Sequence, residues 1–472
     1  MMEKYDLIVI GAGPGGYETA LEASGAYGMK VAIVEKDRLG GTCLNRGCIP
    51  TKTLLHSTKL YGEIKKHGDE IGILNSDSID FDLAKMQDRK DNVLTLLSSG
   101  IDSLMKANKV DVFNGFASIL DRNTVVISTP AKEQIKLSTE KILIATGSVP
   151  SVPPIKGADN DGVITSDEIL NLKRPVSSLT IIGGGVIGCE FASIFGAIGT
   201  KVTIIEAMDR LLPTMDKEIS QNLKMIMKKS LGVDIHVKST VTEISKSENG
   251  LVCHYTEKDK LCLAESDLVL ISIGRKANTD GLISEHSGNE IKSMPMEKGK
   301  ISVDENFQTG IPGIFAIGDV TGGIQLAHVA AGEGRCALAK MNGKGSPVDM
   351  RTIPSCIYTS PEIASVGMSQ DEAKKQNIET ASYKYTMGAN GKSILSLQER
   401  GFIKVVTEKE SGKILGAQMM CARATDMISQ FSQAIVSGLT IYDMGSVIYP
   451  HPTFSEGIGE VVKKEKNNFN RK

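Results

Sequence analysis

The sequence predicts an α/β protein with two similar nucleotide-binding domains and a smaller C-terminal α+β domain. Three observations support this prediction. The order strand, glycine-rich turn, helix, strand occurs near the N-terminus and again in the middle of the chain. After about residue 346 the pattern changes to alternating strands and one amphipathic helix. The length of 472 residues is also sufficient for several domains of ordinary size.

The first of these units reads KYDLIVIGAGPGGYETALEASGAYGMKVAIVEK. A short apolar strand leads into Gly11, Gly13 and Gly16, which form the pattern G-x-G-x-x-G, and a second strand ends in Glu35. Glycines at these positions permit a tight turn and the close approach of a pyrophosphate to the following helix N-terminus. The terminal carboxylate can accept hydrogen bonds from ribose hydroxyls. The unit therefore predicts a Rossmann-like dinucleotide site.

The second unit, SSLTIIGGGVIGCEFASIFGAIGTKVTIIEA, repeats the pattern with Gly183, Gly185, Gly188 and a terminal Glu206. Two such sites allow one nucleotide to deliver electrons and a second cofactor to receive them. A carboxylate at Glu206 pairs with a free 2′-hydroxyl and repels a 2′-phosphate, which favours NAD over NADP. Arg210 is close in sequence and keeps NADP open as the alternative.

The composition excludes several classes of partner. Hydrophobic residues make up 41% of the chain, charged residues 23%, and the net charge of -2 gives no reason to expect nucleic acid. No apolar run is long enough to cross a bilayer, and the N-terminus lacks the pattern of a signal peptide. We therefore expect a cytoplasmic protein that binds no membrane.

The stretch GGTCLNRGCIPTK places two cysteines, Cys43 and Cys48, between glycines and a proline. A structural disulfide is disfavoured in a reducing compartment. A zinc site needs two further ligands, and only His56 is near in sequence, so redox chemistry is the favoured interpretation and no metal is expected. The other six cysteines stand apart and are expected to be buried, inert thiols. They are Cys189, Cys253, Cys262, Cys336, Cys356 and Cys421.

If Cys43 and Cys48 form a bond, the segment between them must depart from a regular helix. Their Cα atoms would be about 8–9 Å apart on an ideal helix, and a disulfide tolerates at most about 7 Å. Gly47 and Pro50 make such a distortion easy. Lys52 follows as either a surface cation or a charge directed at a cofactor.

The C-terminal stretch YPHPTFSEG contains the candidate base, His451, between two prolines and followed by Glu456. A disulfide-exchange site needs a base to form thiolates. A carboxylate bonded to one ring nitrogen leaves the other nitrogen free to act in this way. The alternative is a loop histidine with purely structural bonds.

Together these motifs resemble the class I family of FAD-dependent pyridine nucleotide–disulfide oxidoreductases. The resemblance covers nearly the whole chain, through DLIVIGAGPGGYETA, GGTCLNRGCIPTK, ATGS, GGGVIGCEFA, IGRKANT, AIGDV, LAHVAAGEG, IYTSPEIASVG and HPTFSE. It implies an FAD-binding domain at 1–150, an NAD-binding domain at 151–275, a central segment at 276–346 that completes the FAD site, and a C-terminal dimerisation domain at 347–472.

The resemblance also implies roles for single residues. FAD would occupy the first site, with Asp319 on its ribityl chain, and Cys48 would be beside the flavin while Cys43 exchanges with the substrate. Lys52 would pair with Glu190 near the flavin N5, which replaces the surface interpretation of Lys52. Further positions assigned in this way are Thr146, Gly147, Leu326, Ala327 and His328 for FAD, and Glu190 and Gly274 for NAD.

The implied activity is oxidation of dihydrolipoyl groups by NAD⁺ through a Cys43–Cys48 redox disulfide and FAD. His451 would come from the partner subunit of a homodimer, and the lipoyl groups from an acyltransferase or a glycine cleavage carrier protein. The alternatives are an NADPH-dependent disulfide reductase of the glutathione or mercuric type and a flavoprotein redox sensor without turnover. Arg46 and Ala277 depart from the family pattern.

Overall fold

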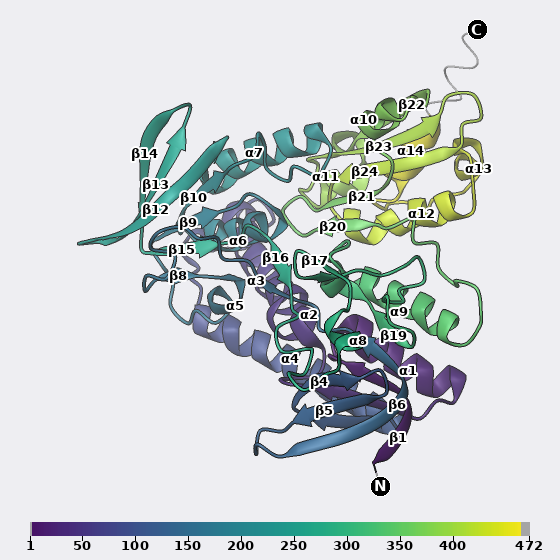
Figure 1. Ribbon diagram of the computed structural model, residues 1–472. Coiled ribbons are helices and arrows are strands. Elements are labelled where there is room, and N and C mark those ends of the chain that lie inside the picture. Colours follow the sequence, from purple (N-terminus) through teal and green to yellow (C-terminus); the bar gives the residue numbers. More distant parts are fainter. Residues whose placement is uncertain (1, 464–472) are drawn as a thin grey trace.

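The computed structural model describes residues 2–463 and arranges them in three parts (Figure 1). The N-terminal domain is at the lower end of the view, the second nucleotide-binding domain at the upper left and the C-terminal domain at the upper right. β7 (Ser148–Pro150) and β16 (Arg275–Ala277) pair as a short antiparallel ribbon between the first two domains. The predicted fold class, two Rossmann-like domains followed by an α+β domain, is confirmed.

The first domain is built on a seven-stranded sheet in the order β3-β2-β1-β6-β5-β4, with β19 beside β6. Its β1 strand is parallel to both β2 and β6 and buried on both faces, since Leu7, Ile8 and Val9 are fully buried. The strands are β1 Glu3–Ile10, β2 Val31–Glu35, β3 Asp111–Asn114, β4 Phe116–Asp121, β5 Thr124–Ser128, β6 Gln134–Ile144 and β19 Ile314–Ala316. The helices are α1 Pro14–Tyr27, α2 Gly41–Arg46, α3 Cys48–His67, α4 Leu83–Ala107 and α9 Ala327–Met341, with a 3₁₀ turn η2 at Gly318–Thr321.

The second domain repeats this design with a five-stranded parallel sheet in the order β11-β10-β9-β15-β8. A three-stranded antiparallel sheet, β12-β13-β14, projects from it at the upper left of Figure 1. The strands are β8 Val163–Ile164, β9 Ser178–Ile182, β10 Lys201–Glu206, β11 Asp234–Val237, β12 Ser239–Ser247, β13 Gly250–Glu257, β14 Lys260–Ser266 and β15 Leu268–Ile271. The helices are α5 Ser166–Ile169, α6 Val186–Ala197 and α7 Lys217–Leu231.

The C-terminal domain has an antiparallel sheet in the order β20-β21-β24-β23-β22. The amphipathic helix predicted near ATDMISQFSQAIVSG is α12 (Ala424–Val436), which packs Met427, Ile428 and Phe431 into the domain core. The strands are β20 Ser355–Ile357, β21 Ile363–Gly367, β22 Thr380–Thr386, β23 Phe402–Glu408 and β24 Ile414–Met420. The other helices are α10 Gln370–Lys375, α11 Gly391–Leu395, α13 Ile441–Gly445 and α14 Glu456–Lys463.

One hydrophobic cluster crosses all three parts. Leu54 of α3 and Phe191 of α6 belong to the same buried cluster as Ile357, Phe402 and Met420 of the C-terminal sheet. Shared burial of this kind fixes the relative positions of the domains, because separating them would expose apolar surface to water.

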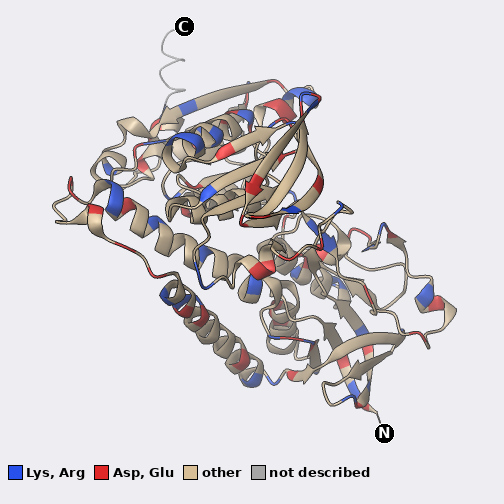
Figure 2. Cartoon of the chain, turned by 90° about the vertical axis from the view of Figure 1, so that its left-hand side faces the viewer, with Lys and Arg blue, Asp and Glu red and all other residues tan. Residues whose placement is uncertain are grey.

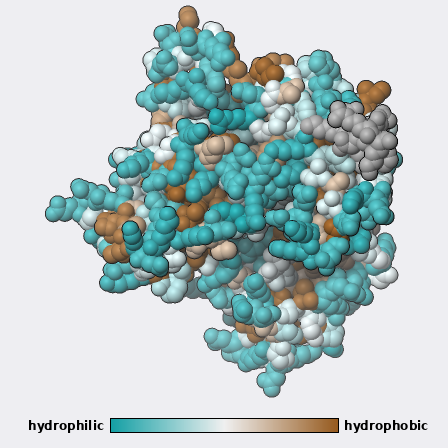
Figure 3. Space-filling model, turned by 90° about the horizontal axis from the view of Figure 1, so that it is seen from above, coloured by the Kyte–Doolittle hydropathy of each residue, from teal (hydrophilic) through white to brown (hydrophobic). Residues whose placement is uncertain are grey.

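The charges follow the prediction from composition. Lysine and arginine are interspersed with aspartate and glutamate along the chain, with no region of a single sign in the view of Figure 2. Seen from above, the surface is mostly hydrophilic, with hydrophobic residues in separate patches (Figure 3). Among residues 2–463, no helix is both long and apolar enough to span a membrane.

Candidate active site

The centre of the site is the cysteine pair at the junction of α2 and α3. Cys43 is in α2, Cys48 is the first residue of α3, and Gly47 interrupts the helical path between them with φ −143° and ψ −112°. A Cβ on Gly47 would be 2.8 Å from the carbonyl oxygen of Thr42, so a side chain there would displace the backbone. Cys43 and Cys48 are free thiols, and across this break each side chain is close enough to act on the pKa of the other.

Of the two cysteines, Cys48 is the one that more readily carries a negative charge. The hydrogen bond from the Cys43 thiol is the largest influence on the pKa of Cys48 and lowers it, and the Lys52 ammonium lowers it further, against burial and the Glu190 carboxylate. The pKa of Cys43 is raised, first by its hydrogen bond to Cys48 and then by burial. The opposite shifts leave one charged sulfur, on Cys48, and one protonated sulfur, on Cys43. The charged thiolate is the reactive form of a cysteine.

An ion pair between two domains lies beside Cys48. Lys52 Nζ is 2.8 Å from Glu190 Oε2, and the Glu190 side chain is only 3% exposed. Lys52 follows Cys48 by one helical turn on α3, whereas Glu190 is on α6 of the second domain. The lysine that the sequence pattern left open as a surface cation is therefore held at a domain junction.

The first glycine-rich turn has the shape that a pyrophosphate requires. Gly11 has a φ of +100°, and a Cβ on Gly16 would be 2.0 Å from the Gly11 carbonyl oxygen. A Cβ on Gly13 would meet none of the described atoms within 4 Å, so the turn is open at the N-terminus of α1. Glu35 Oε2 accepts a 2.8 Å hydrogen bond from the Ala12 N–H. These residues fit a dinucleotide.

The second turn has the same geometry. Gly183 has a φ of +109°, a Cβ on Gly188 would be 2.0 Å from the Gly183 carbonyl oxygen, and a Cβ on Gly185 would meet no described atom within 4 Å. Gly274, whose Cβ position is equally open, lies between β15 and β16. It is therefore at the carboxyl edge of the parallel sheet, where dinucleotides bind in this fold.

Glu206 is held by the main chain at the end of β10. Its Oε2 accepts a 2.5 Å hydrogen bond from the Gly184 N–H and its Oε1 a 2.6 Å bond from Met208. Arg210 is directed elsewhere, because its Nη2 donates to the Pro213 carbonyl oxygen at 2.8 Å. A fixed carboxylate without a free guanidinium beside it favours a ribose hydroxyl over a phosphate.

A polar cluster lies where the first sheet ends. Ser148 Oγ donates to the Asp319 carboxylate in η2, and Arg275 Nε donates to Ser148 Oγ at 2.8 Å. Within residues 2–463, the buried Oγ1 of Thr146 has no hydrogen-bond partner. A Cβ on the adjacent Gly147 would meet no described atom within 4 Å. A buried hydroxyl without a partner, next to open space, fits a bound flavin.

Helix α9 presents its N-terminus close to this cluster. Leu326 precedes α9 and has no polar side chain to cap it, so the N–H groups of Ala327 and His328 lie at the positive end of the helix. The ring of His328 is already bonded, with Nε2 2.8 Å from the Pro354 carbonyl oxygen. The main chain rather than the imidazole is therefore available to the anionic part of a cofactor.

His451 and Glu456 form a pair at the far end of the C-terminal domain. His451 Nδ1 is 2.8 Å from Glu456 Oε1, and Glu456 Oε2 accepts from the Thr453 N–H at 2.8 Å. The hydrogen bond from Thr453, then that from His451, lowers the pKa of Glu456. The His451 side chain is 77% exposed. The loop between α13 and α14 that carries it is well separated from α2 in Figure 1.

The expectation for the other cysteines holds only in part. Four of them are buried, but Cys262 and Cys356 are half-buried. The prediction is wrong for these two because β14 and β20 are edge strands, which leave one flank uncovered. Among the described residues, no group of three or more His, Cys, Asp or Glu side chains could hold a metal ion.

This arrangement of two nucleotide-binding folds, a thiol pair and a C-terminal α+β domain is matched by known families. Residues 5–334 match the pyridine nucleotide-disulphide oxidoreductase family, and residues 353–462 match the dimerisation domain of the same family. The chain belongs to the pyridine nucleotide-disulphide oxidoreductases.

Its relatives include dihydrolipoyl dehydrogenases. One from Bacillus subtilis (strain 168) is 38% identical over 473 residues, which cover 98% of each chain. One from Geobacillus stearothermophilus is 37% identical and aligns with 96% of this chain and 94% of its own. Among solved structures, LpdA from Mycobacterium tuberculosis has a TM-score of 0.89 at 25% identity, covering 98% of this chain and 99% of its own. The Cu(II) complex of the HOCl-induced flavoprotein disulfide reductase RclA from Escherichia coli has a TM-score of 0.87 at 30% identity, covering 98% and 100%.

Membership of this family settles the class of the enzyme. The chain is a flavoprotein oxidoreductase that uses FAD and NAD(H). Its dimerisation domain makes it a homodimer.

Proposed function

We propose that the enzyme is a dihydrolipoyl dehydrogenase that oxidises protein-bound dihydrolipoyl groups with NAD⁺. The direct contact between Cys43 and Cys48, with the charge on Cys48, carries this proposal. The full-length similarity to dihydrolipoyl dehydrogenases supports the choice of substrate. The lipoyl groups would be carried by an acyltransferase or a glycine cleavage protein. The six cysteines outside the Cys43–Cys48 pair are free thiols, which supports a cytoplasmic location.

The reaction begins with the Cys43–Cys48 disulfide that we propose for the oxidised enzyme. His451 of the partner subunit removes a proton from one substrate thiol, and the resulting thiolate attacks Cys43 Sγ. The Cys43–Cys48 bond breaks and Cys48 leaves as a thiolate, which the Lys52 ammonium stabilises. The second substrate thiol then passes its proton to Cys43 as its sulfur attacks the first substrate sulfur. The lipoyl disulfide closes and Cys43 leaves as a thiol, while His451 keeps the first proton. The dithiol loses two electrons and two protons, and the cysteine pair gains the electrons.

The two-electron chemistry that links the thiols to NAD⁺ would be supplied by FAD, which residues of this chain would hold. We propose that Gly11, Gly13, Gly16 and Glu35 hold its adenosine diphosphate half, and that the cluster of Thr146, Gly147 and Asp319 and the start of α9 hold its flavin half. We propose that Gly183, Gly185, Gly188, Glu206 and Gly274 hold NAD, with Glu190 at the boundary of the two sites.

The test is steady-state turnover of the purified homodimer with lipoamide and with oxidised glutathione, each with NADH and with NADPH. Reduction of lipoamide by NADH at a kcat/KM at least about 100-fold above the other three combinations is expected. Preference for NADPH and glutathione would overturn the proposal. The similarity to RclA favours a second candidate, an NADH-dependent reductase of another disulfide. That candidate would gain support if the enzyme oxidised NADH and the addition of lipoamide did not raise the rate.

A further inference from the structure

The ion pair beside Cys48 has a third member from the C-terminal domain, Tyr358, which directly follows β20. The Tyr358 N–H donates a 3.1 Å hydrogen bond to Glu190 Oε1. Because Lys52 occupies Oε2 at 2.8 Å, each oxygen of this buried carboxylate has its own partner. Three segments from three domains therefore meet at one carboxylate.

The ring of Tyr358 contacts the same ammonium. Lys52 Nζ is 4.8 Å from the centroid of the Tyr358 ring, within the range of a cation–π interaction. The ammonium thus lies between a carboxylate and the negative face of an aromatic ring. A lysine has a flexible stem, and a single carboxylate oxygen fixes distance better than direction. The ring supplies the second constraint.

The position of this ammonium matters because it acts on a thiol. Lys52 stabilises the thiolate of Cys48 and Glu190 opposes it, so the net field at the sulfur depends on the balance of the two distances. Lys52 is 28% exposed and has a path toward water. The titratable and charged groups that act on or are influenced by Cys48 are Cys43, Lys52, Glu190, Arg275 and Tyr358.

We propose that the Tyr358 ring is a positioning element that holds the Lys52 ammonium in place, one helical turn from Cys48 on α3, and thereby stabilises the Cys48 thiolate. The C-terminal domain, matched as the dimerisation domain, contributes in this way to the redox centre of its own chain. The importance of this effect for turnover rests on the proposed function, but the effect on the thiol does not.

The test compares Tyr358→Leu with Tyr358→Phe, both in the FAD-loaded homodimer carrying Cys43→Ser. The serine prevents disulfide formation, so Cys48 can be titrated alone. The rate of Cys48 carboxamidomethylation by iodoacetamide is followed against pH by peptide mass spectrometry. Tyr358→Phe keeps the ring, and every variant keeps the main-chain N–H. We expect an unchanged midpoint for Phe and an upward shift of about half a pH unit for Leu.

An unchanged or lowered midpoint in Tyr358→Leu would overturn the proposal. FAD content and melting temperature are measured in parallel, and Tyr358→Met replaces the leucine variant if the latter loses its FAD. Lys52→Met provides the second check, because the leucine substitution should cause no further shift once the ammonium is gone. A remaining shift would mean that the ring acts on Cys48 directly. Since no lipoyl substrate is used, failure of this test is distinct from failure of the proposed function.

Discussion

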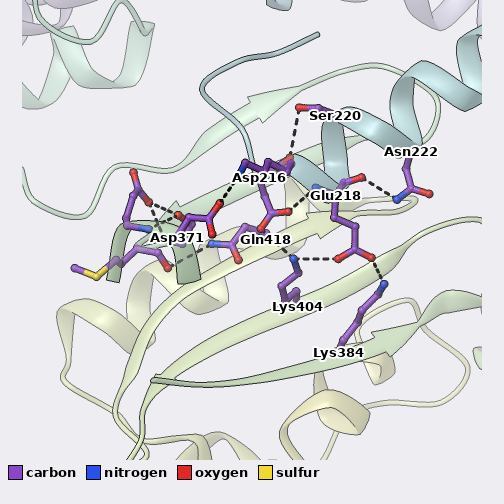
Figure 4. A network of polar contacts seen from close by, with 12 residues as sticks. Asp216, Glu218, Ser220, Asn222, Asp371, Lys384, Lys404 and Gln418 are labelled. Carbon is purple, nitrogen blue, oxygen red and sulfur yellow. Dashed lines mark hydrogen bonds and ion pairs between the residues drawn. The ribbon is translucent and has the colours of Figure 1, made fainter. Parts of the chain in front are cut away.

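Lys404, on β23 of the C-terminal sheet, forms an ion pair with Asp216 at the start of α7 in the second domain, with Nζ 2.9 Å from Oδ2 (Figure 4). The same ammonium is 3.0 Å from Glu218 Oε2. The side chains of Lys404 and Asp216 are only 12% and 13% exposed, so this contact is largely shielded from water. Asp216 also caps α7, accepting from the Glu218 N–H at 2.8 Å, so the pair fixes the orientation of that helix.

Removing this cation should destabilise the protein. Lys404→Met leaves two carboxylates without their shared partner, at a cost of about 3 kcal/mol, because a shielded charge that loses its counter-ion is expensive. Lys384→Met is the matched control, since Lys384 also pairs with Glu218 but is 39% exposed, and less than about 1 kcal/mol is expected. Thermal unfolding measures both. Equal shifts in melting temperature would contradict the ranking.

The hydrogen bond from Cys43 should be visible in the titration of Cys48. Stabilisation of the charged form lowers a pKa, so loss of the donor must raise the pKa of Cys48. Cys43→Ser retains a hydroxyl donor and Cys43→Ala retains none. We expect the alanine variant to be alkylated at Cys48 with a midpoint about one pH unit higher. Coincident profiles would mean that Lys52 and the helix N-terminus govern the thiolate instead.

Alanine substitutions at two glycines of the second turn should affect different properties, NADH binding in one case and thermal stability in the other. Gly185→Ala adds a methyl group to open space, so the melting temperature should be retained while NADH binding weakens at least about 10-fold by obstruction of the pyrophosphate. Gly188→Ala places a Cβ 2.0 Å from a carbonyl oxygen and should lower the melting temperature itself. NADH titration by fluorescence and a thermal melt of each variant separate the two effects. A melting temperature lowered equally in both would refute this division.

The elements that the sequence predicted best are those whose signal is local. The glycine turns, the acids that end β2 and β10, and the helix break at Gly47 all depend on neighbours within one unit of chain. The pairing of Lys52 with Glu190 came from family resemblance alone, because the two are on helices of different domains.

Arg275 and Tyr358 were not singled out, and their contacts explain why. Arg275 is half-buried and donates to Ser148 across the ribbon of β7 and β16, a pairing that no pattern within either strand reveals. Tyr358 makes its contacts through its main-chain N–H and the face of its ring. Almost every residue has such an N–H and every aromatic residue has such a face, so no sequence pattern marks this position. The structure also gives Arg46, which departs from the family, an ion-pair partner in Asp37 next to the first nucleotide site.

Glu206 should be necessary for efficient turnover with NADH, but its removal alone should not allow efficient turnover with NADPH. Glu206→Ala removes the acceptor for both the Gly184 and Met208 N–H groups, which loosens the turn as well as the ribose contact. We expect kcat/KM for NADH to fall about 10- to 100-fold. NADPH should gain little, because Arg210 is bonded to Pro213. Steady-state kinetics with both nucleotides measure this, and efficient use of NADPH by the variant would show that Arg210 is free to turn.

The separation of the loop that carries His451 from helix α2, which carries Cys43, leads to a test of the homodimer. In Cys43→Ser each subunit lacks the exchange thiol, and in His451→Gln each lacks the base, so either homodimer should be nearly inactive. A hybrid dimer has one site with both defects and one with neither, provided that His451 acts across the interface. Random exchange of equal amounts should restore about a quarter of wild-type lipoamide turnover. If His451 served its own chain, every site in the mixture would carry one defect and activity would stay at the level of the parents.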